Sequence, residues 1–440
     1  MTFKKKIGYF LLFLLLFGIG YALNFAVRYA YVGTSYNAKM VCSCKFVAGR
    51  DVESIKKEEL YAVSFSNIDV DEANRTVSAN IYGLATAKAI FRPGLGCTLV
   101  NEMLEREIYL QPKPPTDTTK AQNLKVAAST NINVELLTKT VSEAFEEKNP
   151  AEIMRTRAVV ILHNGNIIAE KYAPNFTENT PLIGWSMTKS VTSAMIGLLV
   201  NDKKLDIYKP APIDEWKNDD RNKITIDHLL RMSSGLDFDE NYTSPGDATT
   251  MLFRVKGAGA YAIKSKIKAE PDKIWSYSSG TTNILQELMR RQFNSHSEYL
   301  AFPHLRLFQK LGMKSAVLEP DASGTYVGSS FMFATARDWA KFGQLYLQDG
   351  VWKNERLLPE GWVKYSATET PKSDGDYAAH FWINHTDKDF PQDAFMALGF
   401  ESQSVTIIPS KQLVIVRLGC TPKDNFNTNG FVKDIVKAVK

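Results

Sequence analysis

The segment Gly184–Val200 reads GWSMTKSVTSAMIGLLV, with a serine and a lysine three residues apart at the start of an apolar run. Apolar side chains recur in this run at intervals of three and four residues, which predicts a helix with a buried face. One helical turn separates Ser186 from Lys189, so both side chains lie on the same side of that helix. A lysine beside apolar side chains is costly to keep charged and can accept the serine proton. The spacing indicates a nucleophilic serine with a lysine base.

The same residues also have a structural interpretation. Ser186 could cap the helix, and Lys189 could extend its ammonium group to the surface. The S-x-x-K pattern is short, and residues 54–57 (SIKK) and 265–268 (SKIK) match it as well. Those two matches lie in charged or lysine-rich stretches, whereas Ser186 alone opens a long apolar helix. The context therefore singles out Ser186 among the three matches, and both interpretations of Ser186 and Lys189 remain open on these residues alone.

A second candidate group is the YSS sequence at residues 277–279, just before another predicted helix that begins near Gly280. A tyrosine close to a lysine can pass a proton to a leaving group. Taken alone, Tyr277 is more often an ordinary half-buried aromatic residue. Its combination with the Ser186 helix favours a catalytic role.

Strand signals lie at both ends of the region that holds these motifs. Residues 157–172 form two apolar runs around His163-Asn164-Gly165-Asn166, which predicts a hairpin. Residues 399–419 form two further runs around Pro409-Ser410-Lys411. Helical spacing lies between them and also over 134–145. The pattern predicts an α/β (α+β) layered domain whose antiparallel sheet is closed by its first and last hairpins.

Longer segments carry a resemblance to a known family: ITIDHLLRMSSGLDF (224–238), GSSFMFATARDWAKFGQLYLQDGVW (328–352) and GFESQSVTIIPSKQLVIVRLG (399–419). With SMTK and YSS, and in this order, the chain resembles the serine β-lactamase-like hydrolases over about residues 130–440. This family includes class C β-lactamases, D-Ala-D-Ala carboxypeptidases, esterases and 6-aminohexanoate-dimer hydrolases. The resemblance implies a β-lactamase/transpeptidase-like fold with an inserted, mostly helical lobe.

The resemblance also implies roles for individual residues. Ser186 matches the nucleophile of the family, Lys189 its partner on the helix, and Tyr277 the tyrosine that shuttles a proton. The backbone amides of Ser186 and Phe400 would form the oxyanion hole. No cofactor is implied.

Three departures from the family pattern bear on the substrate. Ser279 stands where the lactamases have asparagine, and the family's K-T-G element falls at Ala397-Leu398-Gly399 without its lysine and threonine. That pair helps to hold a substrate carboxylate, so its loss argues against penicillins and peptidoglycan stem peptides. The 6-aminohexanoate-hydrolase and esterase branches also lack the lysine, and YSSGTTN looks most like the former. We expect Ser279, Gly399 and Gln403 to contact substrate, although Ser402 replaces a glycine found before Gln403 in many relatives.

The N-terminus carries three lysines at residues 4–6 ahead of an uncharged apolar run from Ile7 to Val27. This pattern predicts export, with the remainder of the chain on the periplasmic or extracytoplasmic side. An uncleaved membrane anchor is favoured over a cleaved signal peptide, because no A-x-A-like cleavage site precedes the polar sequence. We expect an anchor or signal segment over residues 1–30, a small accessory region and linker over 31–125, and the hydrolase domain over 126–440.

Four cysteines fit an exported protein, because such proteins can keep disulfides. Cys97 is expected to pair with Cys42 or Cys44, while Cys420 is either paired or a buried thiol.

Composition excludes other functions. A formal net charge of +5 over 440 residues, with no dense basic block after the first six, does not support nucleic-acid binding. The six histidines show no metal-ligand spacing, so no metal is implied. We therefore expect a serine hydrolase that cleaves a small-molecule ester or amide through an acyl-enzyme. The alternatives are a cell-wall D,D-carboxypeptidase or weak β-lactamase, and a non-catalytic ligand-binding or sensor protein.

Overall fold

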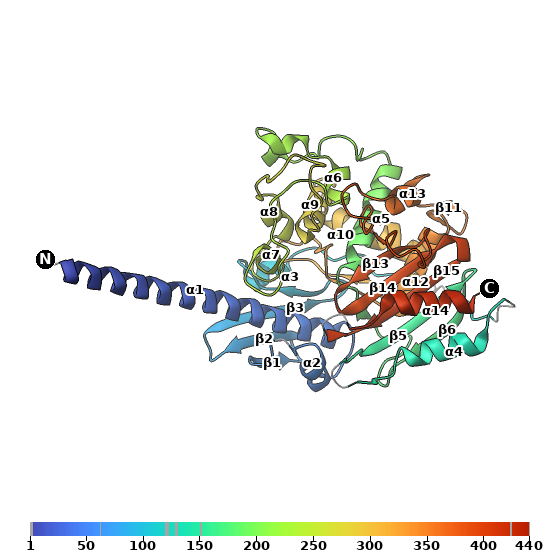
Figure 1. The fold of residues 1–440 in the computed structure, drawn as a ribbon, viewed down its shortest axis with the longest axis horizontal. Coiled ribbons are helices and arrows are strands. Elements are labelled where there is room, and N and C mark those ends of the chain that lie inside the picture. Colours follow the sequence, from blue (N-terminus) through green and yellow to red (C-terminus); the bar gives the residue numbers. More distant parts are fainter. Residues whose placement is uncertain are drawn as a thin grey trace.

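A computed structural model describes residues 3–61, 63–118, 123–127, 131–149, 152–422 and 425–439. Part of the expected linker, residues 119–122, lies outside the described residues. Three groups of elements position the candidate site: a central sheet, a helical lobe, and an N-terminal unit built around one long helix (Figure 1).

The central sheet has six antiparallel strands in the order β12-β13-β14-β15-β5-β6. Strand β15 pairs with β5 from Leu413↔His163 to Gly419↔Thr156, so the last hairpin closes on the first. This confirms the predicted layered fold. The strands are β5 (Thr156–His163), β6 (Asn166–Tyr172), β12 (Trp382–Ile383), β13 (Phe395–Gly399), β14 (Gln403–Ile408) and β15 (Leu413–Gly419).

Helices cover both faces of this sheet, which explains why every residue of β15 is buried. Helix α12 (Ala336–Leu347) packs on one face, and α4 (Val134–Glu143) and α14 (Thr428–Ala438) pack on the other. Gly343 brings α12 close to the sheet, because a Cβ at this position would lie 2.5 Å from Val414 Cγ1. The predicted hairpin is also confirmed: Asn164 and Gly165, between β5 and β6, both have positive φ, as a type I′ turn requires.

The helical lobe is formed by the chain between β6 and β13, and Figure 1 shows its helices α6 to α10 beside the central sheet. Helix α5 (Met187–Asn201) joins the lobe to the sheet, and 13 of its residues are buried. The other elements of this part are α6 (Ile226–Leu230), α7 (Asp247–Phe253), α8 (Ala258–Ala262), α9 (Ser279–Arg290), α10 (His296–Pro303), α11 (Gln309–Leu311), α13 (Trp362–Ala367), β7 (Leu182–Ile183), β8 (Val317–Leu318), β9 (Met332–Ala334), β10 (Val351–Trp352) and β11 (Glu355–Arg356).

Helix α1 (Phe3–Phe46) is continuous but has two different environments. Its first part projects away from the body of the molecule (Figure 1), and its large apolar side chains from Phe3 to Val27 are exposed. Its last part, from Gly33 to Cys44, is buried apart from the partly buried Tyr36. In the part of the chain that the structure describes, α1 is the one helix long and apolar enough to cross a membrane.

The buried end of α1 packs on a four-stranded antiparallel sheet in the order β1-β2-β3-β4. A disulfide joins Cys42 of α1 to Cys97 of β4, with the Cα atoms 6.0 Å apart, while Cys44 and Cys420 are free and buried. The elements of this unit are α2 (Val52–Glu58), β1 (Asn67–Asp71), β2 (Thr76–Ile81), β3 (Ala85–Arg92), β4 (Gly96–Leu99) and α3 (Glu105–Tyr109).

A buried ion pair fastens this unit to the rest of the molecule. Lys39 Nζ lies 2.6 Å from a carboxylate oxygen of Glu319, and both side chains are almost fully buried. The Glu319 carboxylate also accepts hydrogen bonds from Ser43 Oγ and from the Cys97 amide. The charged groups are thus paired and hydrogen-bonded, as burial requires.

Candidate active site

The turn before α5 presents Ser186 at the start of that helix. Trp185 has φ +47°, a left-handed backbone conformation that is rare for a bulky residue. Gly184 is required just before it, because a Cβ there would lie 2.4 Å from the Trp339 ring. The chain is therefore tightly constrained around Ser186, which lines a cavity.

Lys189 is 1% exposed, and its Nζ is surrounded by oxygen atoms. It donates to Ser186 Oγ at 3.0 Å, to Ser279 Oγ at 3.0 Å and to the Ser329 carbonyl at 3.1 Å. The same Nζ lies 4.8 Å from the centre of the Tyr277 ring. The structure thus brings Ser186, Lys189 and Tyr277 together, although they come from two helices far apart in the sequence.

The three residues of the YSS sequence have three different surroundings at the start of α9. Tyr277 lines the cavity, with its ring centre 5.2 Å from that of Trp382 and 5.7 Å from that of Tyr377. Ser278 caps α9 by accepting from the Thr281 amide. Ser279 is fully buried and contacts Lys189, so it lies beneath the cavity rather than in its lining.

Glu240 is a site residue that the sequence analysis missed. Its carboxylate accepts from the Ser279 amide at 2.7 Å, from Ser279 Oγ at 2.6 Å and from the Tyr242 hydroxyl at 2.8 Å. Burial and the neighbouring Glu240 raise the pKa of Tyr242 well above its usual value, so this hydroxyl stays protonated and donates. Because the Ser279 hydroxyl donates its hydrogen bond to Glu240, its oxygen can accept the hydrogen bond from Lys189 Nζ.

The end of β13 lies against the turn that holds Ser186. A Cβ on Gly399 would lie 2.2 Å from the Gly184 carbonyl oxygen, so only glycine fits this approach. The first amides of a helix have no partner within it, and α5 begins at Met187, directly after Ser186. The approach places the Phe400 backbone beside this helix start, where two amides can converge.

Gln403 and the two residues before Gly399 offer the cavity no polar side chain. Gln403 is fully buried, and it donates to the Gly419 carbonyl at 2.7 Å and accepts from the Gly419 amide at 2.9 Å. Its side chain therefore joins β14 to β15, in a place different from the substrate contact we expected. Ala397 is buried and Leu398 packs against the cluster under the sheet.

Glu401, next to Phe400, is a buried acid with a raised pKa. Burial raises its pKa to about 7, although the Arg157 guanidinium acts in the opposite direction. Its carboxylate accepts from Trp185 Nε1 at 3.3 Å and from the Cys420 thiol at 3.4 Å. Glu401 therefore couples the two turns that flank the candidate oxyanion hole.

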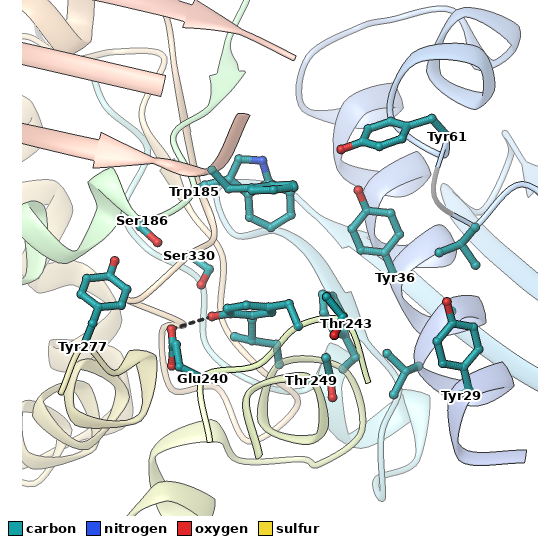
Figure 2. Close-up of a pocket in the computed structure, with 17 residues that line it drawn as sticks. Tyr29, Tyr36, Tyr61, Trp185, Ser186, Glu240, Thr243, Thr249, Tyr277 and Ser330 are labelled. Carbon is teal, nitrogen blue, oxygen red and sulfur yellow. Dashed lines mark hydrogen bonds between the residues drawn. The ribbon is translucent and has the colours of Figure 1, made fainter. Parts of the chain in front are cut away.

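The cavity at the site has a volume of about 490 Å³, within the range of small-molecule pockets. Figure 2 shows Ser186 and Tyr277 on one side of it and the tyrosines of α1 on the other. Most lining side chains are aromatic or aliphatic: Tyr29, Val32, Tyr36, Tyr61, Val63, Trp185, Tyr242, Leu252, Phe253, Tyr277 and Phe400. Among the described residues, no group of three or more His, Cys, Asp or Glu side chains could hold a metal ion.

Comparison with known proteins agrees with this geometry. The Beta-lactamase family profile matches residues 142–429, which is more than half of the chain. The chain belongs to the beta-lactamase family. Membership of this family makes it a serine hydrolase, and the resemblance noted in the sequence is confirmed.

Individual relatives of this beta-lactamase family member are distant. The 6-aminohexanoate-dimer hydrolase of Paenarthrobacter ureafaciens is 21% identical over 292 residues, covering 61% of this chain and 73% of that enzyme. A Bacillus anthracis structure provisionally assigned as the same hydrolase has a TM-score of 0.55 at 21% identity, covering 73% of this chain and 87% of its own. EstCE1, a hydrolase with promiscuous acyltransferase activity, has a TM-score of 0.56 at 15% identity, covering 70% and 99%. At these identities the structures establish the fold.

Proposed function

We propose that the protein is an exported, membrane-anchored serine hydrolase that cleaves a carboxylic ester or amide through an acyl-enzyme on Ser186. The observation that carries this proposal is the contact of 3.0 Å between Lys189 Nζ and Ser186 Oγ at the wall of an apolar cavity. A buried lysine in contact with a serine hydroxyl is the arrangement that activates such a nucleophile.

The proposed mechanism assigns each step to a group of this chain. Lys189 takes the proton of Ser186 as Oγ bonds to the substrate carbonyl carbon. The amides of Ser186 and Phe400 donate to the oxyanion that forms. As the bond to the leaving oxygen or nitrogen breaks, the proton passes from Lys189 to the leaving group by way of Tyr277. Water then attacks the acyl-enzyme, and an acid is released.

The substrate class follows from what lines the cavity. Ala397 and Leu398, at the end of β13, provide neither a cation nor a hydroxyl for a substrate carboxylate, and the lining of the cavity is mainly apolar. This composition favours an uncharged ester or amide over a penicillin or a stem peptide.

Export is supported by α1 and by the cysteines. A disulfide between Cys42 and Cys97 suits an oxidising compartment. Lysines at residues 4–6 favour a cytoplasmic N-terminus. Because residues 33–44 of the same helix are buried in the domain, we propose that α1 is retained as an anchor.

A fluorophosphonate probe tests the nucleophile. The full-length protein should be labelled, and Ser186→Ala should not, while it keeps the unfolding temperature of the parent. Lys189→Ala should lose almost as much turnover on p-nitrophenyl acetate as Ser186→Ala, because the two residues act as one unit. Labelling that persists in Ser186→Ala, or its absence in the parent, would contradict the proposal and favour a ligand-binding or sensor protein. Nitrocefin turnover within about tenfold of the best ester would instead favour a β-lactamase.

A further inference from the structure

The cavity at Ser186 is walled by the same helix that carries the exposed apolar segment. Tyr29, Val32, Gly33 and Tyr36, all on α1, line it. In Figure 2, Tyr29 and Tyr36 face the cavity from the side opposite Ser186. This wall is continuous with the stretch up to Val27, whose large apolar side chains are exposed.

Helix geometry gives the height of this wall above a membrane. The apolar run from Ile7 to Val27 has about 20 residues, which at 1.5 Å each span about 30 Å, the thickness of the hydrocarbon core. Arg28, the first charged residue after it, then lies at the outer interface, and Tyr29 lies in the zone that favours tyrosine. With α1 as the proposed anchor, the cavity therefore begins where the bilayer ends.

The wall runs from this interface to the nucleophile. Tyr29 and Tyr36 are about 10 Å apart along the helix axis. The Tyr36 ring stacks on Trp185, the neighbour of Ser186, with ring centres 6.5 Å apart and planes within 2°. The Tyr36 ring also meets Phe253 in an edge-on contact, with ring centres 5.7 Å apart. Mainly apolar side chains of α1, together with Trp185, thus line the cavity from Tyr29 to the residue next to Ser186.

We infer that the substrate is a fatty acyl ester or amide taken from the outer leaflet, with its hydrocarbon chain lying along α1 between Tyr29 and Tyr36. This inference rests on the proposed hydrolase function and adds the source and shape of the substrate. Ser186 Oγ bonds to the carbonyl carbon, the bond to the alcohol oxygen or amine nitrogen breaks, and the serine proton leaves with that group. Water then gives the fatty acid and restores Ser186.

Chain-length dependence tests the inference. The full-length protein in detergent micelles is assayed on p-nitrophenyl esters from acetyl to dodecanoyl. Each methylene that enters the apolar channel should raise kcat/KM roughly fourfold until the channel is full. Val32→Trp fills the channel and should lower the ratio of dodecanoyl to acetyl kcat/KM at least tenfold. Val27→Trp is the matched control, because Val27 is 53% exposed and does not line the cavity.

Fluorophosphonate labelling separates the possible failures. If Val32→Trp is not labelled, the variant has misfolded, and Val32→Phe, which fills less space, takes its place. Labelling and acetyl-ester cleavage without any chain-length dependence would overturn this inference and leave the hydrolase standing, with a small water-soluble substrate. No labelling and no cleavage of any ester in the parent would overturn the proposed function itself.

A second measurement needs no variant. Full-length protein is reconstituted in phosphatidylcholine vesicles, and p-nitrophenyl hexadecanoate is supplied either in the same vesicles or in separate ones. Hydrolysis in the same vesicles should be at least tenfold faster, because the ester reaches the cavity by moving within the leaflet. Equal rates would mean that substrate arrives through water, and would overturn the inference.

Discussion

Glu401→Gln is the change whose effect can be worked out most directly from the structure. Glu401 is 2% exposed, and burial raises its pKa to about 7, against about 4.5 in an unfolded chain. The folded state therefore binds the proton more tightly than the unfolded state. The contribution of Glu401 to the free energy of unfolding is fully present below pH 4.5 and is lost as the pH rises through 7. A difference of about 2.5 pKa units corresponds to about 3 kcal/mol.

The assay is urea unfolding of the full-length protein in detergent micelles at pH 5 and pH 8.5. Between these values most of the effect develops, so the parent should lose about 2 to 3 kcal/mol of unfolding free energy from this group. Glutamine has nearly the same shape and no proton to lose. Relative to the parent, the unfolding free energy of Glu401→Gln should therefore rise by about 2 to 3 kcal/mol between pH 5 and pH 8.5. Glu360→Gln, which changes an exposed carboxylate, is the control and should follow the parent.

Activity gives an independent measure of the same titration. The Glu401 carboxylate is one residue from the Phe400 amide and contacts the Trp185 indole, so its negative charge opposes an oxyanion at this site. The ratio of kcat/KM for Glu401→Gln to that of the parent should rise several-fold between pH 6 and pH 8.5. A difference in unfolding free energy that stays constant from pH 5 to 8.5, together with a constant activity ratio, would refute the assigned titration.

Two further predictions concern the groups around Lys189. Tyr277→Phe should lower cleavage of p-nitrophenyl acetate roughly 10- to 100-fold but cleavage of an amide on the order of 10³-fold, because only the amine needs a proton to leave. Equal losses on both substrates would mean that Tyr277 only shapes the cavity. Ser279→Ala removes one of the three oxygens that Lys189 Nζ contacts. It should lower kcat roughly 10- to 100-fold, because the ammonium that forms when Lys189 takes the serine proton loses a hydrogen bond. Ser279→Asn supplies an amide oxygen to Lys189 and should recover part of the lost kcat. If Ser279→Asn has the same kcat as Ser279→Ala, the hydrogen bond to Lys189 does not account for the loss.

Local patterns sufficed for those parts of the site that depend on a single helix or hairpin. The spacing of Ser186 and Lys189 on one helical turn and the turn at residues 163–166 are fixed by nearby sequence, and the structure has both. Tyr277 was paired with them on the chemistry of a tyrosine near a lysine and on the resemblance to a family, since nothing local links residues 91 positions apart.

Other parts of the site depend on how distant segments pack. Glu240 reaches Ser279 across 39 positions, and in the sequence it is one of several acidic residues in a polar loop. Gln403 was expected at the cavity. A shift of strand pairing by one residue turns every side chain of the strand to the other face of the sheet. The sequence alone does not fix the register of β14 against its neighbours. The role of α1 was hidden for a different reason. Its apolar N-terminal part can be recognised from composition, whereas the polar residues that continue the same helix into the core give no such sign.

The way α1 is held is consistent with the proposal that one helix serves both as an anchor and as a wall of the cavity. An anchor joined by a flexible linker would leave the domain free to turn at the membrane surface. Here the disulfide to Cys97 and the ion pair between Lys39 and Glu319 fasten the helix within three turns of Tyr36. Helix α1 has no break between Ile7 and these contacts. The orientation of the helix about its own axis therefore fixes which side chains face Ser186, and its rise per residue fixes their distance from the apolar segment. A cavity that only took substrate from water would need neither constraint. Both constraints are required if hydrocarbon chains are to pass from the leaflet to the nucleophile along one face of the helix.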